Sequence, residues 1–155
     1  MAAHGIVAGK PYYLVYDNRG VGIEVETNWD WVRLSNKQDG PWHTVTFHEY
    51  EGGRYVIEHE TGHWDDYKYW QLSSQGVSLN KWDPSTAWTI HPTKNGFLLG
   101  KGDNVLVVVK DGKKWLKAKE SGLALGFSLS QLDPVHHVRE MSMSTSVVEF
   151  QAVPA

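Results

Sequence analysis

The chain of 155 residues has no cysteine and carries a formal net charge of -3, from 15 basic and 18 acidic side chains. The lack of cysteine excludes disulfides, iron–sulfur clusters, thiolate metal sites and a cysteine nucleophile. The acidic balance argues against a general nucleic-acid binder, and no apolar run approaches the length of a membrane-spanning helix. Eight tryptophans and seven tyrosines make the chain rich in aromatic side chains.

Short segments that alternate apolar and polar residues predict β-strands along the chain. The clearest of these strands lie at 55–59, 77–80, 88–90 and 105–109. Residues that favour turns separate them at 17–20, 39–41, 51–53, 95–96 and 111–112. No long segment combines helical periodicity with capping residues, so we expect an all-β protein.

Three similar units follow one another and predict an internal repeat. Each unit begins with an aromatic strand and ends with another aromatic or apolar strand. The opening aromatics are Tyr13, Tyr55 and Phe97, and the closing ones are Trp42, Trp88 and Phe150. The units span about 10–52, 53–95 and 96–155 of a single domain that covers residues 1–155, and the third contains an insertion at 130–145.

This threefold pattern resembles the β-trefoil family. The resemblance implies twelve strands in three repeats around a pseudo-threefold axis, with six strands closing a barrel and six capping it. The opening and closing aromatics would then fill the core, while an ordinary β-sandwich is the alternative architecture.

The chain resembles the fungal and ricin-B-like trefoil lectins, including the lectin-like subunit of mushroom tyrosinase. The resemblance implies a non-enzymatic carbohydrate-binding protein that acts through the loops of a rigid barrel and uses no cofactor. The Gln-x-Trp motif of ricin-B is absent, so no sugar site is transferred from that family. Aromatic faces beside carboxylate and amide groups suit sugars. The candidate residues are Asp17, Trp29, Trp31, Asn36, Trp64, Asp65, Tyr67 and Asn80, and the densest aromatic–acidic segment is 64–69.

A looser resemblance connects the chain with the trefoil protease inhibitors of mushrooms. Such proteins insert an exposed loop into a protease cleft. Arg19, in the segment 17–22, would suit a trypsin-like pocket lined by a carboxylate. An inhibitor that uses the Arg19 loop is therefore the alternative function.

The segment His59-Glu60-Thr-Gly-His63 matches the H-E-x-x-H pattern of zinc metalloproteases. On a helix, His59 and His63 would bind zinc and Glu60 would act as a base. The segment aligns with predicted strands, contains Gly62 and has no third ligand at a recognisable spacing. We therefore expect no metal site, and zinc at His59 and His63 is a minor alternative.

The expected partners are glycans or a protein, either a protease or a larger enzyme subunit. Nucleic acid and membrane insertion are not expected, and self-association is left open. The N-terminal residues show no basic segment followed by an apolar one, as a signal peptide would. The expected location is the cytoplasm, or the outside after release without a visible signal peptide.

Overall fold

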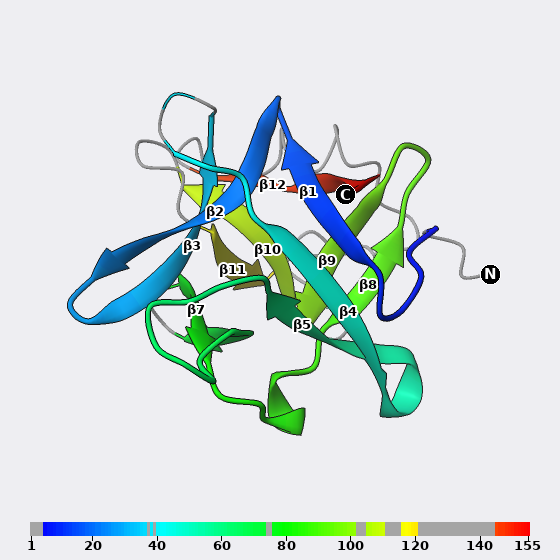
Figure 1. Cartoon of the computed structure of the whole chain (residues 1–155). Helices are drawn as coiled ribbons and strands as arrows, with labels where there is room; N and C mark the ends of the chain where they lie inside the picture. The colour runs from blue at the N-terminus through cyan, green and yellow to red at the C-terminus, as the bar shows by residue number, and fades with distance from the viewer. Residues whose placement is uncertain are drawn as a thin grey trace.

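The computed structural model describes residues 5–36, 38, 40–73, 76–101, 105–110, 116–120 and 145–155 (Figure 1). These residues form strands and two 3-10 turns, η1 (Glu51–Gly53) and η2 (Pro84–Thr86), which confirms the all-β expectation for the described part of the chain. The strands are β1 (Pro11–Tyr16), β2 (Arg19–Glu26), β3 (Trp29–Ser35), β4 (Thr44–Tyr50), β5 (Arg54–His59), β6 (Tyr69–Ser73), β7 (Gly76–Asn80), β8 (Thr89–Pro92), β9 (Phe97–Lys101), β10 (Val105–Lys110), β11 (Leu116–Glu120), β12 (Thr145–Val147) and β13 (Glu149–Pro154).

Seven strands close an antiparallel ring in the order β1, β2, β3, β7, β6, β5 and β4, and β4 pairs back with β1. Two of the joints are narrow: Trp31 pairs with Ser78 between β3 and β7, and Glu58 pairs with Tyr69 between β5 and β6. The hairpin of β2 and β3 is paired along its whole length and extends away from the rest of the sheet in Figure 1.

A second circuit closes on the other side of the molecule. The backbone N–H of Tyr55 donates to the carbonyl oxygen of Trp88 at 2.8 Å, and the N–H of Trp88 donates to the carbonyl oxygen of Tyr55 at 2.6 Å. This bridge joins β5 to the start of β8, and pairing continues through β9 and β13 to β1. The two circuits share β1, β4 and β5, so these three strands form the centre of the fold.

The β-trefoil expected from the sequence is wrong. Two fused circuits, one of them a closed seven-strand ring, replace a single six-strand barrel with three equal caps. The pair Trp31–Ser78 draws the hairpins of the first two units into the ring. The third unit differs, because β10 pairs with β12 as well as with β9 and β11. The units are therefore not equivalent in their hydrogen bonding.

The core expectation is confirmed at four of the six aromatic positions. The side chains of Tyr55, Trp88, Phe97 and Phe150 are buried. Tyr13 is only partly buried, because side chains alternate along β1 and its neighbours Tyr12 and Leu14 face inward instead. Trp42 is partly buried as well; its ring covers Gly20 so closely that a Cβ atom at that position would collide with it.

A neutral histidine is built into the core at the end of β5. His59 is fully buried, and its Nδ1 accepts a hydrogen bond of 3.2 Å from the indole Nε1–H of Trp70. Its proton therefore sits on Nε2, which lies 3.0 Å from Nδ1 of His43. Burial first, and the nearby His43 second, lower the pKa of His59 to about 3.

The burial of neutral His59 predicts that the folded protein loses stability in acid. The pKa of His59 lies below its ordinary value of 6.5, so protons bind preferentially to the unfolded chain. The stability that neutral His59 contributes is complete above about pH 6.5 and falls as the pH decreases toward 3, by about 1.4 kcal/mol per pH unit. Urea unfolding between pH 4 and pH 8 should show this slope. His59→Phe should flatten it, and His63→Gln, at an exposed site, should not; an equally steep slope in His59→Phe would contradict the assignment.

Candidate functional site

Several aromatic side chains gather where the tip of the β2–β3 hairpin meets the loop 60–68. Two long-range hydrogen bonds hold the loop there. The backbone N–H of His63 donates to Oδ2 of Asp30 at 2.5 Å, and the indole Nε1–H of Trp64 donates to the carbonyl oxygen of Asn28 at 3.0 Å. The loop is therefore fastened to β3 and to the turn of this hairpin.

Asp30 is the buried member of this contact, with a relative exposure of 1%. Its Oδ1 has no hydrogen-bond partner among the described residues. The loop passes close above it at Gly62, where a Cβ atom would lie 2.5 Å from the carbonyl oxygen of Tyr67 and 3.3 Å from Asp30 Oδ2. Only glycine fits this close approach, so Asp30 and Gly62 together set the path of the loop.

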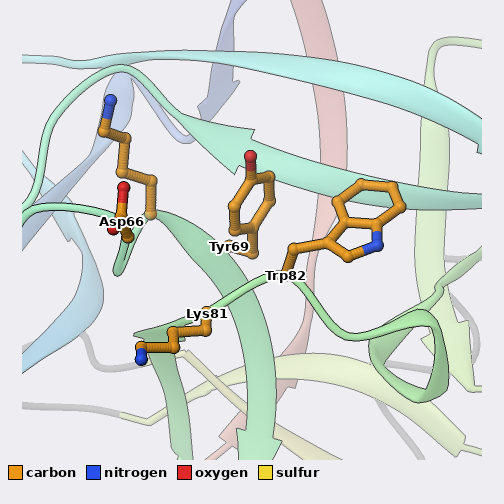
Figure 2. Close-up of a pocket in the computed structure, with 5 residues that line it drawn as sticks. Asp66, Tyr69, Lys81 and Trp82 are labelled. Atoms are coloured by element: carbon orange, nitrogen blue, oxygen red, sulfur yellow. The ribbon is translucent and has the colours of Figure 1, made fainter.

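The first of two hollows beside this loop is the lysine–aromatic pocket, of about 380 Å³. In Figure 2, Tyr69 is seen between Asp66 and Trp82, with Lys81 nearby. The rings of Tyr69 and Trp82 meet edge to face, with 5.4 Å between their centres. The lining residues are Asp66, Lys68, Tyr69, Lys81 and Trp82. They come from the end of the loop, the start of β6 and the residues after β7.

The Tyr69 hydroxyl is protonated at neutral pH, as an ordinary tyrosine is. Partial burial raises the pKa of Tyr69 above its ordinary value, and the charges of Glu58 and Asp66 raise it further. The hydroxyl can therefore act as a hydrogen-bond donor at neutral pH. Next to it, Trp82 packs edge to face against His48, whose Nε2 lies 2.8 Å from Oε1 of Glu58.

The second hollow, here called the tip hollow, has a volume of about 280 Å³ and is lined by Asn28, Trp29, Trp64 and Tyr67. The rings of Trp29 and Tyr67 are 6.0 Å apart between centres. Lys81 connects the two hollows, because its Nζ lies 5.4 Å from the centre of the Tyr67 ring. The result is one continuous face with aromatic rings at both ends and an ammonium group between them.

This face brings together only part of the residue set predicted for carbohydrate. Trp29, Trp64 and Tyr67 line the tip hollow, and Asp65 lies between the last two in the loop. The others do not line the tip hollow. Asp17 is in the β1–β2 turn, Trp31 donates its indole N–H to the Glu26 carbonyl, Asn36 accepts from Gln38 N, and Asn80 accepts from Lys81 N. The role of this residue set in binding stays a prediction.

Sequence reasoning missed Lys68 and Lys81. Each lysine immediately precedes an exposed or half-buried aromatic residue, in Lys68-Tyr69 and Lys81-Trp82. That repeated lysine–aromatic pair is the sequence signal that could have identified them. Its meaning depends on the pairing of β6 with β7, which sets Tyr69 opposite Asn80 and so brings the two lysines to one end of the hairpin.

The structure also shows where the residues of the inhibitor and zinc alternatives lie. Arg19 is the first residue of β2 and pairs with Tyr16, so it is part of a hairpin rather than the apex of a protruding loop. His59 is buried with both ring nitrogens engaged, while His63 lies on the exposed loop. No group of three metal-binding side chains occurs in the part of the chain that the structure describes.

Comparisons with known proteins give a fold and no family. No family model matches the chain, and no curated protein matches it. A structure of the lysenin pore matches with a TM-score of 0.62 and 13% identity, over 96% of this chain and 48% of the other. A complex of lysenin with phosphocholine matches with a TM-score of 0.65 and 12% identity, over 97% and 47%. The chain thus has a lysenin-like fold and spans about half the length of these lysenin chains.

This likeness overturns the earlier resemblance. The strands follow lysenin over nearly the whole chain, so the resemblance to trefoil lectins, to the tyrosinase-associated subunit and to mushroom inhibitors is wrong. The lectin, inhibitor and zinc-protease functions are corrected with it. The expected partners, which were glycans, a protease or a larger enzyme subunit, are corrected as well. The expectation that the chain does not insert into membranes is corrected with them. Among the described residues, no helix is long and apolar enough to cross a bilayer.

The hydrogen bond that the buried Asp30 accepts from the loop should contribute to the free energy of unfolding. Asp30→Ala removes the acceptor of the His63 N–H and should lower the free energy of unfolding by about 2 kcal/mol. Asp30→Asn keeps an oxygen acceptor and should lose less. Asp65→Ala, on the exposed part of the same loop, should change stability by under about 0.5 kcal/mol. Urea unfolding measures all three, and equal stabilities for Asp30→Ala and Asp65→Ala would contradict the anchoring role.

Proposed function

We propose that the chain binds the phosphocholine headgroup of lipids in the lysine–aromatic pocket. The observation that carries this proposal is chemical: aromatic rings and two lysines line one hollow. Phosphocholine is a zwitterion that needs both kinds of partner. Support comes from the fold, because a lysenin complex with phosphocholine is among the similar structures.

The quaternary ammonium group cannot donate a hydrogen bond, so it is recognised by ring faces and nearby negative charge. Trp82 has a relative exposure of 47%, and the centre of its ring lies 5.4 Å from the centre of the Tyr69 ring. Asp66 adds a carboxylate on the same pocket wall. The pocket thus supplies an aromatic surface with a counter-charge for the trimethylammonium end.

The phosphate end requires donors and positive charge. Lys68 and Lys81 each bring an ammonium group to the pocket, and the Tyr69 hydroxyl adds a hydrogen-bond donor. Charge-assisted hydrogen bonds from such donors to phosphate oxygens are short and strong. The same wall therefore serves both ends of one small headgroup. The proposed role is binding without a reaction, as the sequence led us to expect.

The proposal is tested by calorimetric titration with soluble phosphocholine. Trp82→Ala should weaken binding about tenfold through the loss of the ring contact. Lys81→Met should weaken phosphocholine binding while leaving the binding of choline alone unchanged. Replacing the trimethylammonium by a tert-butyl group, in 3,3-dimethylbutyl phosphate, should also weaken binding because the ligand then lacks the cation.

A matched control is available in the same chain. Lys10 is exposed and its Nζ lies 5.9 Å from the centre of the Tyr12 ring, away from the pocket. Lys10→Met should bind phosphocholine as the unmodified chain does. The absence of binding heat at millimolar phosphocholine, or equal losses in Lys10→Met and Lys81→Met, would overturn the proposal.

A further inference from the structure

We propose that the β2–β3 hairpin tip and Trp64 form a membrane-docking surface that enters the interfacial layer of a zwitterionic phosphocholine bilayer. The inference rests on the proposed headgroup site, which lies beside this surface. It assigns a separate task to the tip: apolar contact with the bilayer rather than recognition of the headgroup. Val25, Trp29 and Trp64 carry that contact, and they are called the docking triad below.

Exposed apolar side chains are concentrated at this tip. Among the described residues, the large apolar side chains that remain exposed are Val7, Val25, Trp29, Trp64, Trp82 and Val153. Trp29 is 40% exposed and Trp64 47%, and both line the tip hollow. Val25 is the next-to-last residue of β2 and is separated from the turn by Glu26. Tryptophan is enriched where membrane meets water, since its ring suits the headgroup level of a bilayer.

Two indole N–H groups at the tip are already hydrogen-bonded within the protein. Thr27 and Asn28 form its two-residue turn with φ angles of 51° and 65°, a conformation that matches the twist of the flanking strands. The indole N–H of Trp64 already donates to the Asn28 carbonyl, and that of Trp31 to the Glu26 carbonyl at 3.1 Å. Entry into the interface therefore breaks neither hydrogen bond, and the rings are ordered beforehand.

The tip hollow adjoins the headgroup pocket, and this arrangement sets the orientation of the protein on a bilayer. Tyr67 lines the tip hollow, Lys81 lines the pocket, and Lys81 Nζ lies over the Tyr67 ring. Asp66 and Lys68, which also line the pocket, flank Tyr67 in the loop. A lipid whose headgroup occupies the pocket therefore has its neighbours in the bilayer next to the docking triad.

The carboxylates near the tip favour a zwitterionic bilayer over an anionic one. Glu26 is exposed at the end of β2, and Asp65 and Asp66 are exposed beside Trp64. The whole chain carries -3. These carboxylates disfavour an anionic surface, whereas a zwitterionic surface presents no net charge to repel them. The apolar contact of the triad is therefore matched to a phosphocholine bilayer.

The test is co-sedimentation of the full chain with phosphatidylcholine vesicles, alongside titration with soluble phosphocholine. Trp29→Ser should lower vesicle partitioning about tenfold, and Val25→Ser by a few fold, through the lost apolar contact. Val153→Ser is the matched control: Val153 is 44% exposed against 49% for Val25, and it lies on β13. It should partition as the unmodified chain does.

Four outcomes separate the two proposals. Triad variants that lose vesicle binding but keep soluble phosphocholine binding support the docking surface. The same loss in a chain that binds no soluble phosphocholine supports the docking surface and overturns the headgroup site. Triad variants that lose soluble binding as well place the tip within the headgroup site and overturn the inference. Unchanged vesicle binding also overturns it.

Vesicle composition provides a second check. Replacing part of the phosphatidylcholine by phosphatidylserine should reduce partitioning in low salt, because the carboxylates near the tip are repelled. Stronger binding to the anionic vesicles would contradict the proposed match between surface and bilayer.

Discussion

The candidate face depends on one buried carboxylate. Asp30 accepts a hydrogen bond from the His63 backbone and lies beneath the point where the loop passes at Gly62. A buried polar group is costly unless it is hydrogen-bonded, so the contact of Asp30 with the loop is a strong positional constraint. Because Tyr67 and Lys68 belong to the loop and Tyr69 follows it, the position of both hollows depends on this contact and on the Trp64–Asn28 hydrogen bond.

The aromatic residues divide into two groups with different physical roles. Trp70 and Trp88 are fully buried, and the Trp88 indole donates to the Trp70 carbonyl at 3.1 Å. Lys101 adds to this interior group, because its Nζ lies 4.1 Å from the centre of the Trp88 ring and donates to the carbonyl oxygens of Thr86 and Ala87. Trp29, Trp64 and Trp82 remain at the surface, where packing does not require a large ring.

Local sequence pattern predicted the strands, several turns and much of the core, because alternation and β-branching act over a few residues. It also placed Trp29 and Trp64 among the surface candidates and Trp88 in the core, where the structure has them. It failed where distant strands meet. Nothing in the residues around Trp31 or Ser78 specifies their pairing, and that pair places β3 beside β7 in the seven-strand ring. The approach of Lys81 to Tyr67 depends on the same kind of long-range register.

The shared loop has a consequence for the strength of attachment. The headgroup pocket and the docking triad are fixed to one another by Asp30 and by the Trp64–Asn28 hydrogen bond. Once either contact forms at a bilayer, the other is held at a high effective concentration, and dissociation requires both to break together. Two contacts that are each weak in solution can therefore give a long residence time on a membrane, and loosening the loop would shorten that time without removing a single contact residue.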